Sequence, residues 1–315
     1  MIDGIPKISV LIITYKQEKL ISRSLDALLA QRDYLYEICV SDDCSPDGTW
    51  EVLLGYKEKY PDLIKIHRNE QNVGIFENIE QVYTMPTGDV VNLMAGDDEP
   101  GEGWFKSVVE YIQEKNIDYK NELFCIYGDH VVLYGNGDSR RARNRAIAKR
   151  PNDALRLALR SMISNRGCCF SINVLKMFDK VSQGRSYYVE LAQDRLLQMY
   201  AEKNYYIPKI TNIYYARIGV STHIEEDTFK QIRPYMEECL HRKGIEIKKK
   251  DLYFNKYIMA RGEFRKYHRV NALIQSIWYK IKSIDLSMPY NTEATRQLVF
   301  AVRRRIPHKK PIHFD

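Results

Sequence analysis

Short β-branched runs alternate with amphipathic stretches through the first third of the chain. This alternation predicts βαβ units and a mostly parallel sheet. Thr49 follows the turn Pro46-Asp47-Gly48 and is expected to cap the second helix. In chain order, the expected strands and helices alternate over residues 8–14, 18–30, 37–41, 49–60, 64–67, 75–84 and 89–94.

The rest of the chain has a mixed pattern. We expect one catalytic domain over residues 1–224, with halves 1–110 and 111–224, followed by a basic helical region over 225–315. The elements expected in the second half are a helix ending near Lys115, strands 123–127 and 131–134, a basic loop 140–150, a helix 154–163, a small-residue segment 165–171, a helix 190–203 and strands 205–208 and 213–217.

Composition points to a globular protein. The hydrophobic fraction is 44% and the charged fraction 28%, both ordinary for globular chains. The sequence shows no signal peptide, and no segment approaches the roughly 18 apolar residues that span a bilayer. We therefore expect a cytoplasmic protein. Its six cysteines lack paired CxxC spacing and are expected to be free thiols.

Charge is uneven along the chain. Residues 240–315 carry 18 Lys and Arg against 6 Asp and Glu, a balance of +12, so residues 1–239 carry −5 of the net +7. Apolar residues at helical spacing, Leu273, Ile274, Ile277 and Ile281, lie beside Trp278 in this region. The pattern fits either a helix on an anionic membrane surface or one packed on the catalytic domain. These helices can also pair subunits in a homo-oligomer. No nucleic-acid motif is present, and no such partner is expected.

Two acidic pairs follow predicted strands. Asp42-Asp43 comes after the second strand and Asp97-Asp98 after the fourth, so both pairs should face one crevice at the carboxyl edge of the sheet. A carboxylate there can accept hydrogen bonds from a nucleobase or ribose. Adjacent carboxylates also suit Mg²⁺ or Mn²⁺, which bind one or two carboxylates together with substrate phosphates. A solvated acidic turn is the alternative reading of each pair alone.

Five sequence blocks resemble family 2 glycosyltransferases of the bacterial surface-polysaccharide type. In order and spacing they are residues 8–15, 38–49, 68–74, 86–91 and 96–99. The resemblance implies an α/β GT-A fold, which is a Rossmann-like mixed, mostly parallel sheet flanked by helices, here with a C-terminal helical extension. It also implies a nucleotide-sugar donor, most frequently a UDP-sugar, a divalent metal (Mn²⁺ or Mg²⁺) and inversion at the anomeric carbon.

The resemblance assigns roles by position. It implies a base and ribose pocket made by Thr14, Tyr15, Asp42 and Asp43. It implies that Arg68 lies near the phosphates, and that Asp97 with Asp98 forms the DxD-like donor and metal site. Asp98 is the expected metal ligand. Where the family often has an acidic residue, this chain has Ala95, a change that can shift a ribose or metal contact.

A fainter resemblance covers residues 190–197 and 206–222. The family's catalytic base lies in this block, and Asp194 matches it better than Glu190. An inverting displacement needs one such carboxylate to accept the proton of the acceptor hydroxyl. The alternative is a helix-surface Asp beside an arginine. Where relatives often carry a histidine near a glycine pair, this chain has Arg217, with His223 further on, as candidates to compensate the diphosphate.

The favoured function is transfer of a sugar to a hydroxyl of a glycan or lipid-linked acceptor in surface polysaccharide or glycoconjugate synthesis, at the cytoplasmic face of the membrane. A sugar-nucleotide nucleotidyltransferase would need a glycine-rich loop after the first strand, and residues 13–18 contain no glycine. A non-catalytic nucleotide-sugar-binding partner of an assembly complex is the remaining alternative, suggested by Ala95.

Overall fold

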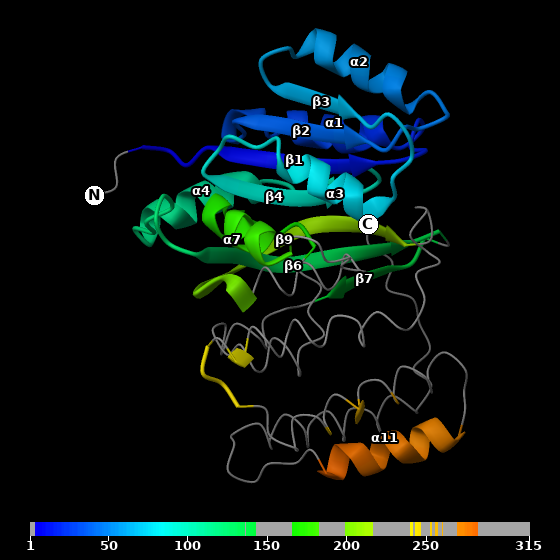
Figure 1. Cartoon of the computed structure of the whole chain (residues 1–315), viewed down its shortest axis with the longest axis vertical. Helices are drawn as coiled ribbons and strands as arrows, with labels where there is room; N and C mark the ends of the chain where they lie inside the picture. Colours follow the sequence, from blue (N-terminus) through cyan, green and yellow to red (C-terminus); the bar gives the residue numbers. More distant parts are fainter. Residues whose placement is uncertain are drawn as a thin grey trace. The chain divides into compact units, whose positions relative to one another are not determined.

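The chain forms two compact units, Met1–Ile245 and Glu246–Asp315. The computed structural model in Figure 1 describes residues 4–135, 137–142, 166–182, 199–216, 240–241, 243–246, 253, 256–257, 260 and 270–282. The predicted boundary after residue 224 and the predicted helix 154–163 fall outside these ranges. In the second unit the longest described element is helix α11 (Val270–Lys282), in the region predicted to be helical.

The first half of the first unit is built from alternating strands and helices. They are β1 (Ile8–Thr14), α1 (Ile21–Leu29), β2 (Glu37–Asp42), α2 (Thr49–Lys59), β3 (Ile64–Arg68), α3 (Ile75–Tyr83) and β4 (Val90–Ala95), with a short 3-10 turn η1 (Arg32–Tyr34) before β2. The four strands pair in parallel in the order β3-β2-β1-β4. This order places the first strand in the middle, so its carboxyl end has a neighbour on each side.

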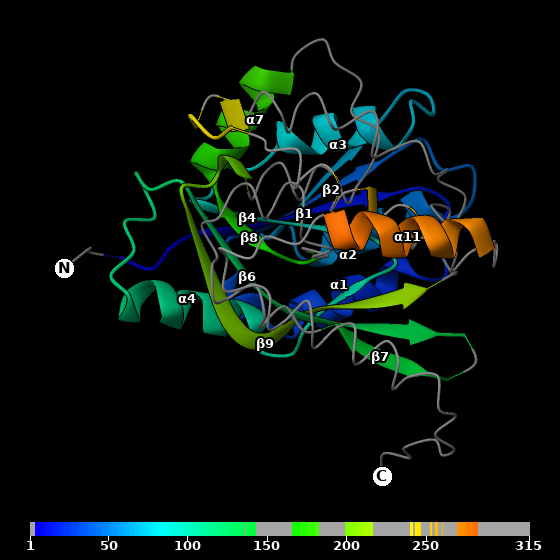
Figure 2. The ribbon, with the colours of Figure 1, turned by 90° about the horizontal axis from the view of Figure 1, so that it is seen from below.

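Both faces of the central strands are covered. Every residue of β1 and of β2 is buried, which is usual for parallel strands lying between helical layers. Seen from below, α3 and α7 lie on one face of the sheet and α1 and α4 on the other (Figure 2). Helix α1 turns an apolar face inward through Ile21, Leu25 and Leu28, all fully buried.

The second half extends the same sheet. Its elements are β5 (Glu99–Pro100), α4 (Trp104–Glu114), β6 (Phe124–Tyr134), β7 (Ser139–Ala142), β8 (Cys169–Ser171), α7 (Ile172–Ser182) and β9 (Lys203–Ala216). The described residues form a nine-stranded sheet in the order β3-β2-β1-β4-β8-β6-β9-β5, with β7 paired to β6. Strands β6 and β9 are parallel, whereas β8 runs antiparallel to β4 and β6. The predicted mixed, mostly parallel sheet flanked by helices is confirmed.

Several predicted boundaries in the second half were wrong. Strands predicted at 123–127 and 131–134 are one strand, β6, with an irregular register around Gly128. A Cβ on Gly128 would lie 2.5 Å from the carbonyl oxygen of Lys209, so the glycine permits close approach of β9 rather than breaking the strand. The strands predicted at 205–208 and 213–217 are likewise one strand, β9, which begins at Lys203, where a helix was predicted to end.

Other local expectations also changed. Residues 140–142 of the predicted basic loop belong to β7 (Ser139–Ala142), and the small-residue segment contains β8. Gly48, and not Thr49, is the N-cap of α2, and Asp47 Oδ1 accepts hydrogen bonds from both the backbone N–H (3.2 Å) and the hydroxyl (2.5 Å) of Thr49. The five cysteines in the described ranges are free thiols, as predicted.

Candidate active site

Three parallel strands end side by side at one edge of the sheet. The register pairs Thr14 of β1 with Asp42 of β2, and Ile13 of β1 with Ala95 of β4. Beyond these pairs, Asp43 donates its backbone N–H to Thr14 O at 3.0 Å, and Gly96 donates to Ile13 O at 3.0 Å. The two acidic pairs therefore lie on either side of the end of β1, where ligands bind in open α/β sheets.

The loops that follow β1 and β2 are tied together. Lys16 donates its backbone N–H to Ser45 Oγ at 3.0 Å, and Gln17 donates to Thr49 Oγ1 at 2.9 Å. Lys16 and Cys44 have φ values of 55° and 54°, in the left-handed region that non-glycine residues rarely adopt. Such strain persists where surrounding contacts fix the conformation, and it clusters at ligand sites.

Asp42 lies fully buried at the end of β2. Its carboxylate accepts hydrogen bonds from the Ser45 N–H (3.1 Å) and hydroxyl, and Arg68 Nε lies 3.5 Å from Oδ2. Burial raises the pKa of Asp42, and the bonds from Ser45 and the charge of Arg68 partly oppose that rise. Arg68 also donates to Ser45 O at 2.9 Å. The guanidinium of Arg68, which is expected to lie near the phosphates, thus braces the turn formed by Asp42 and Ser45.

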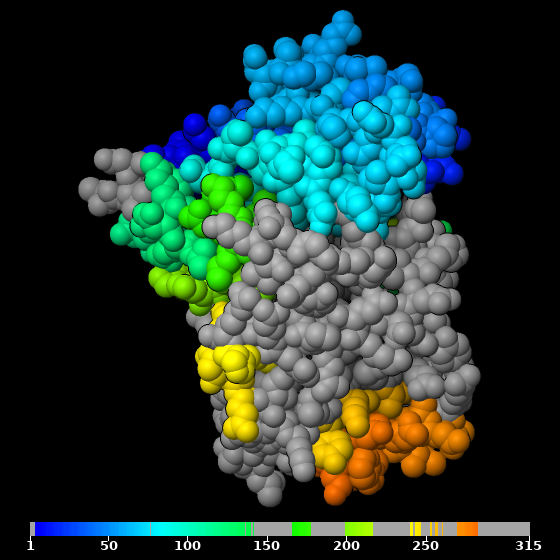
Figure 3. Space-filling view, viewed as in Figure 1, coloured from blue at the N-terminus to red at the C-terminus, as the bar shows by residue number. Residues whose placement is uncertain are grey.

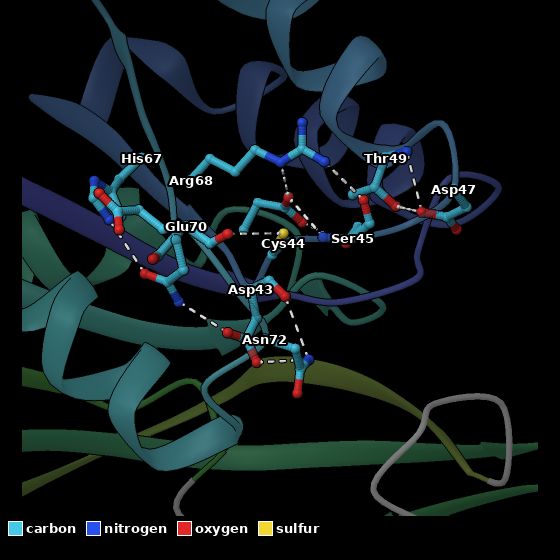
Figure 4. A network of polar contacts seen from close by, with 12 residues as sticks. Asp43, Cys44, Ser45, Asp47, Thr49, His67, Arg68, Glu70 and Asn72 are labelled. Carbon is cyan, nitrogen blue, oxygen red and sulfur yellow. Dashed lines mark hydrogen bonds and ion pairs between the residues drawn. The ribbon is translucent and has the colours of Figure 1, made fainter.

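Asp43 organises the neighbouring loop. Oδ1 accepts hydrogen bonds from the Asn69 amide and the Val73 N–H, both at 2.9 Å, and Oδ2 from the Asn72 amide (3.0 Å) and the Gly74 N–H (2.9 Å). Figure 4 shows Asn72 beside Asp43, with dashed lines between them. These bonds use the roughly four acceptor directions of a carboxylate. The implied contact of Asp43 with a base or ribose stays a prediction.

The acidic turn after β4 is packed tightly against the end of β1. A Cβ on Gly96 would collide with Gln17 Oε1 and lie 3.2 Å from Thr14 Cβ, while Thr14 Oγ1 donates to Gln17 Oε1 at 2.7 Å. From α1, Ser24 Oγ contacts Gly96 O at 2.7 Å and Asp98 O at 2.5 Å. Both Asp97 and Asp98 are buried. Thr14 therefore packs beside Gly96 and orients the Gln17 side chain against the acidic turn.

Asp98 and Glu99 face residues from distant parts of the chain. Asn212 Nδ2 donates to Asp98 Oδ2 at 3.3 Å, and Arg166 Nη1 lies 3.7 Å from the same oxygen. For Glu99, the Oε1 atom accepts the Tyr215 hydroxyl at 2.5 Å and forms an ion pair with an α1 arginine at 2.9 Å. Burial and the bond to Glu99 raise the pKa of Tyr215 to about 12, so its hydroxyl stays protonated at neutral pH.

The α1 arginine, Arg23, closes this arrangement. Its guanidinium lies 3.6 Å from the Tyr215 ring centroid, and Nη2 donates to Asp97 O at 2.6 Å. No sequence pattern marks Arg23, Arg166 or Asn212. Their partners in the acidic turn lie 68 to 114 residues away along the chain, and no local pattern marks such a pairing.

The donor atoms of the acidic turn fit a divalent cation that is shared with a substrate. Among the described residues, no group of three or more His, Cys, Asp and Glu is placed to hold a metal ion. Asp97 and Asp98 can supply carboxylate oxygens, and Mg²⁺ commonly takes one or two carboxylates together with substrate phosphates and water. A metal here would depend on a diphosphate for the rest of its ligands.

The remaining predicted residues are placed as follows. Tyr15 is partly buried after β1, with the Lys16 ammonium 5.1 Å from its ring centroid, and Ala95 ends β4. The candidate base Asp194 and its alternative Glu190, and the candidate cations Arg217 and His223, all lie outside the described residues.

Comparison with known proteins agrees with this geometry. Residues 9–178 match the family model described as Glycosyl transferase family 2. A processive diacylglycerol beta-glycosyltransferase of Mycoplasma pneumoniae is 30% identical over 113 residues, which cover 35% of this chain and 33% of the relative. The chain spans about a third of the length of several curated relatives that it matches.

Two solved structures share the fold. Staphylococcus aureus TarS 1-349 in complex with UDP-GlcNAc aligns with a TM-score of 0.59 at 19% identity, covering 87% of this chain and 79% of TarS. The mannosyltransferase PcManGT of Pyrobaculum calidifontis, in complex with GDP-Man and Mn²⁺, aligns with a TM-score of 0.53 at 16% identity, covering 96% of this chain and 81% of PcManGT. At these identities the likeness concerns the GT-A fold.

Proposed function

Because the chain belongs to glycosyl transferase family 2, we propose that it transfers a sugar from a nucleoside-diphosphate sugar, such as a UDP-sugar, to a hydroxyl of a glycan or lipid-linked acceptor. The observation that carries this proposal is the carboxyl edge of the sheet. There, Asp42 with Arg68 on one side and Asp97 with Asp98 on the other flank the end of β1. This arrangement offers hydrogen-bond acceptors for a nucleoside, and carboxylates that can share a divalent cation with a diphosphate.

On the donor side, we assign the base and ribose to Thr14, Tyr15 and the Asp42-Asp43 turn. Arg68, with its guanidinium braced on that turn, would lie near the phosphates. A divalent cation held by Asp98 and Asp97 would offset the negative charge that develops on the leaving diphosphate. TarS was solved with UDP-GlcNAc and PcManGT with GDP-Man, so proteins of this fold bind donors with different bases. The choice of base in this chain would depend on the residues of its own pocket.

On the acceptor side, we assign the base to Asp194, on its position in the sequence. Its carboxylate would take the proton of the acceptor hydroxyl as that oxygen attacks the anomeric carbon from the face opposite the diphosphate. A single base in this position gives inversion.

The donor proposal is tested by thermal unfolding with UDP, GDP, dTDP or CMP, each with and without Mn²⁺. A ligand that binds the folded state raises the apparent melting temperature by mass action. We expect one nucleotide to stabilise the protein in a metal-dependent manner, and Asp98→Ala to remove that dependence. The control Glu110→Gln removes an exposed carboxylate of α4 and should leave the shift intact. No shift with any nucleotide would contradict the proposed donor site.

Turnover separates the enzyme from the alternative, a non-catalytic nucleotide-sugar-binding partner of an assembly complex. Asp194→Asn should bind the nucleotide as tightly as the unaltered protein but lose at least about a hundredfold in kcat, within the usual range for a general base. A protein that binds the donor but never transfers its sugar, with glycan and lipid-linked acceptors supplied, would support the non-catalytic reading.

We further propose that the second unit attaches the protein to an anionic membrane surface. Residues 246–315 carry 16 Lys and Arg against 6 Asp and Glu. Helix α11 exposes one apolar row of side chains. Figure 3 shows the atoms of this helix, in orange, at the surface. The row consists of Val270 (65% exposed), Ile274 (59%), Ile277 (53%), Trp278 (49%) and Ile281 (60%). An amphipathic helix of this kind lies in the lipid interface when basic residues accompany it. No helix in the described ranges combines the length and apolar character needed to cross a bilayer.

Vesicle flotation tests this attachment. The protein should float with vesicles containing phosphatidylserine and not with pure phosphatidylcholine, and Ile277→Glu should reduce the bound fraction severalfold. The matched control is Leu54→Glu, which places the same charge at an exposed apolar position of α2 in the first unit. Equal flotation of both variants would contradict a role for α11.

A further inference from the structure

Arg166 lies at the same edge of the sheet as the acidic turn. Strand β8 runs antiparallel to β4, with Cys169 opposite Asn92. The residues that directly precede β8, from Arg166 on, therefore run alongside the carboxyl end of β4, which Asp97 and Asp98 follow. The sequence resemblance assigned no role to Arg166.

The backbone of this turn is firmly held. Asn92 Nδ2 donates to Gly167 O at 2.8 Å and to Cys168 O at 3.0 Å, and Thr211 Oγ1 donates to Arg166 O at 2.6 Å. Gly167 has φ = 68°, and a Cβ there would lie 2.9 Å from Thr211 O. Strands β4 and β9 thus fix the Cα of Arg166 from two sides.

The side chain is also positioned in advance. Its guanidinium carbon lies 3.7 Å from the Tyr214 ring centroid, which is cation–π contact, and the side chain is only 13% exposed. Nη1 lies 3.7 Å from Asp98 Oδ2, which is within ion-pair range but too far for a hydrogen bond. The positive charge of Arg166 offsets the negative charge of buried Asp98 across this distance. A guanidinium has five N–H donors in a planar fork that suits phosphate oxygens.

We propose that Arg166 binds the diphosphate of the donor, and that it exchanges Asp98 for phosphate oxygens when the nucleotide enters. This inference rests on the proposed function. In the free protein, the arginine offsets the charge of Asp98, which would otherwise be costly to bury. With donor bound, the diphosphate takes the guanidinium, and Asp98 becomes available to a cation shared with the phosphates. Arg166 is then a second positive charge of the donor site, supplied from β8 rather than from the nucleotide half.

Calorimetric titration with matched ligands tests the proposal. UDP, GDP and dTDP are each compared with uridine, guanosine and thymidine in the presence of Mn²⁺. For the nucleotide that binds the unaltered protein, Arg166→Met should weaken diphosphate binding by about tenfold to a hundredfold, the range for charge-assisted hydrogen bonds. Its affinity for the matching nucleoside should change less than about twofold, because the nucleoside has no phosphate. A general structural defect would weaken both ligands.

Two further variants keep the test decisive. Arg166→Lys keeps a positive charge near Asp98 and should fold even if the methionine variant does not, but it loses the planar fork, and we expect an intermediate loss of diphosphate affinity. The control Arg32→Met removes an exposed arginine of η1, which precedes β2 and so lies toward the opposite, amino edge of the sheet, and should leave both ligands unaffected.

The outcomes separate this inference from the proposed function. If no nucleotide binds the unaltered protein, the donor site itself is refuted. If a nucleoside diphosphate binds the unaltered protein, Arg166→Met and Arg166→Lys with equal affinity, the role of Arg166 is refuted while the donor site stands. Parallel losses for nucleoside and diphosphate would also overturn the inference, since they would show that Arg166 only shapes the pocket.

Discussion

Asp43→Asn should destabilise the loop of residues 69–74, whose donors the Asp43 carboxylate accepts. In the protein, each carboxylate oxygen accepts two hydrogen bonds from residues 69–74. The substitution turns one oxygen into an amide that donates, so two of the four donors then meet another donor. Hydrogen bonds to charged groups contribute about 1.5–3 kcal/mol each, which bounds the loss at about 3–6 kcal/mol.

The loop is partly exposed, and this lowers the expected cost. Asn72 and Val73 are exposed residues, so water can satisfy part of what the carboxylate releases, and the Asn72 amide can present its oxygen instead. We therefore expect the free energy of unfolding to fall by about 2–4 kcal/mol. The loss should appear as a lower urea midpoint with an unchanged m-value, because the surface exposed on unfolding stays the same.

Limited proteolysis localises the effect. Cleavage within residues 69–74 should accelerate in Asp43→Asn. Asp47→Asn serves as the control, because Asp47 is less buried and its partners belong to the start of α2 and to Glu18. In this variant, the loop of residues 69–74 should stay resistant to the protease. If Asp43→Asn kept the full stability and loop protection, the reasoning would be refuted, because the four hydrogen bonds would then not hold the loop.

Three further substitutions probe the scaffold of the site. Gly96→Ala would force its new methyl against Gln17 and should cost about 1–3 kcal/mol in urea unfolding with a matching loss of nucleotide binding, whereas Gly55→Ala, in open space on α2, should be harmless. Asn92→Asp would set a carboxylate against two carbonyls and should lower stability by more than about 3 kcal/mol, and a loss below 1 kcal/mol would contradict those bonds. Burial alone would raise the pKa of Glu37, but its ion pair with Lys65 and its hydrogen bonds lower that pKa below the ordinary value of 4.5. The ionised carboxylate therefore stabilises the fold at pH values above 4.5, and this contribution disappears as the pH falls through the lowered pKa. Glu37→Gln should therefore be less stable at pH 7, show a flatter loss between pH 5 and 3, and refute the assignment if its pH profile parallels that of the unaltered protein.

The first half of the fold could be predicted closely because its signals are local. The strand at Ile8–Thr14 was predicted residue for residue, and the helices from α1 to α3 within a few residues at each end. Buried parallel strands form continuous apolar runs, and amphipathic helices separate them, so periodicity alone finds both. The acidic pairs could be placed at one edge for the same reason, since parallel strands share a carboxyl edge.

The second half was less predictable because its strands depend on distant partners. Strand β8 consists of three residues in a run of small side chains, and it exists because Cys169 and Phe170 pair with β4 on one side and β6 on the other. Gly128 and Pro208 look like strand breakers in sequence but lie within continuous strands, where tertiary contacts outweigh propensity. The missed site residues follow the same rule.

Residues from both halves of the fold converge on the acidic turn, and this gives its position a physical meaning. Ser24 and Arg23 hold its backbone from α1, while Tyr215 holds Glu99 and Asn212 holds Asp98 from β9. A shift of β9 would therefore move the carboxylates that we assign to the donor, and a shift of the donor site would be felt on β9. Because β9 belongs to the half assigned to the acceptor, the buried turn links the two halves through hydrogen bonds, and a substitution in it should affect both substrates.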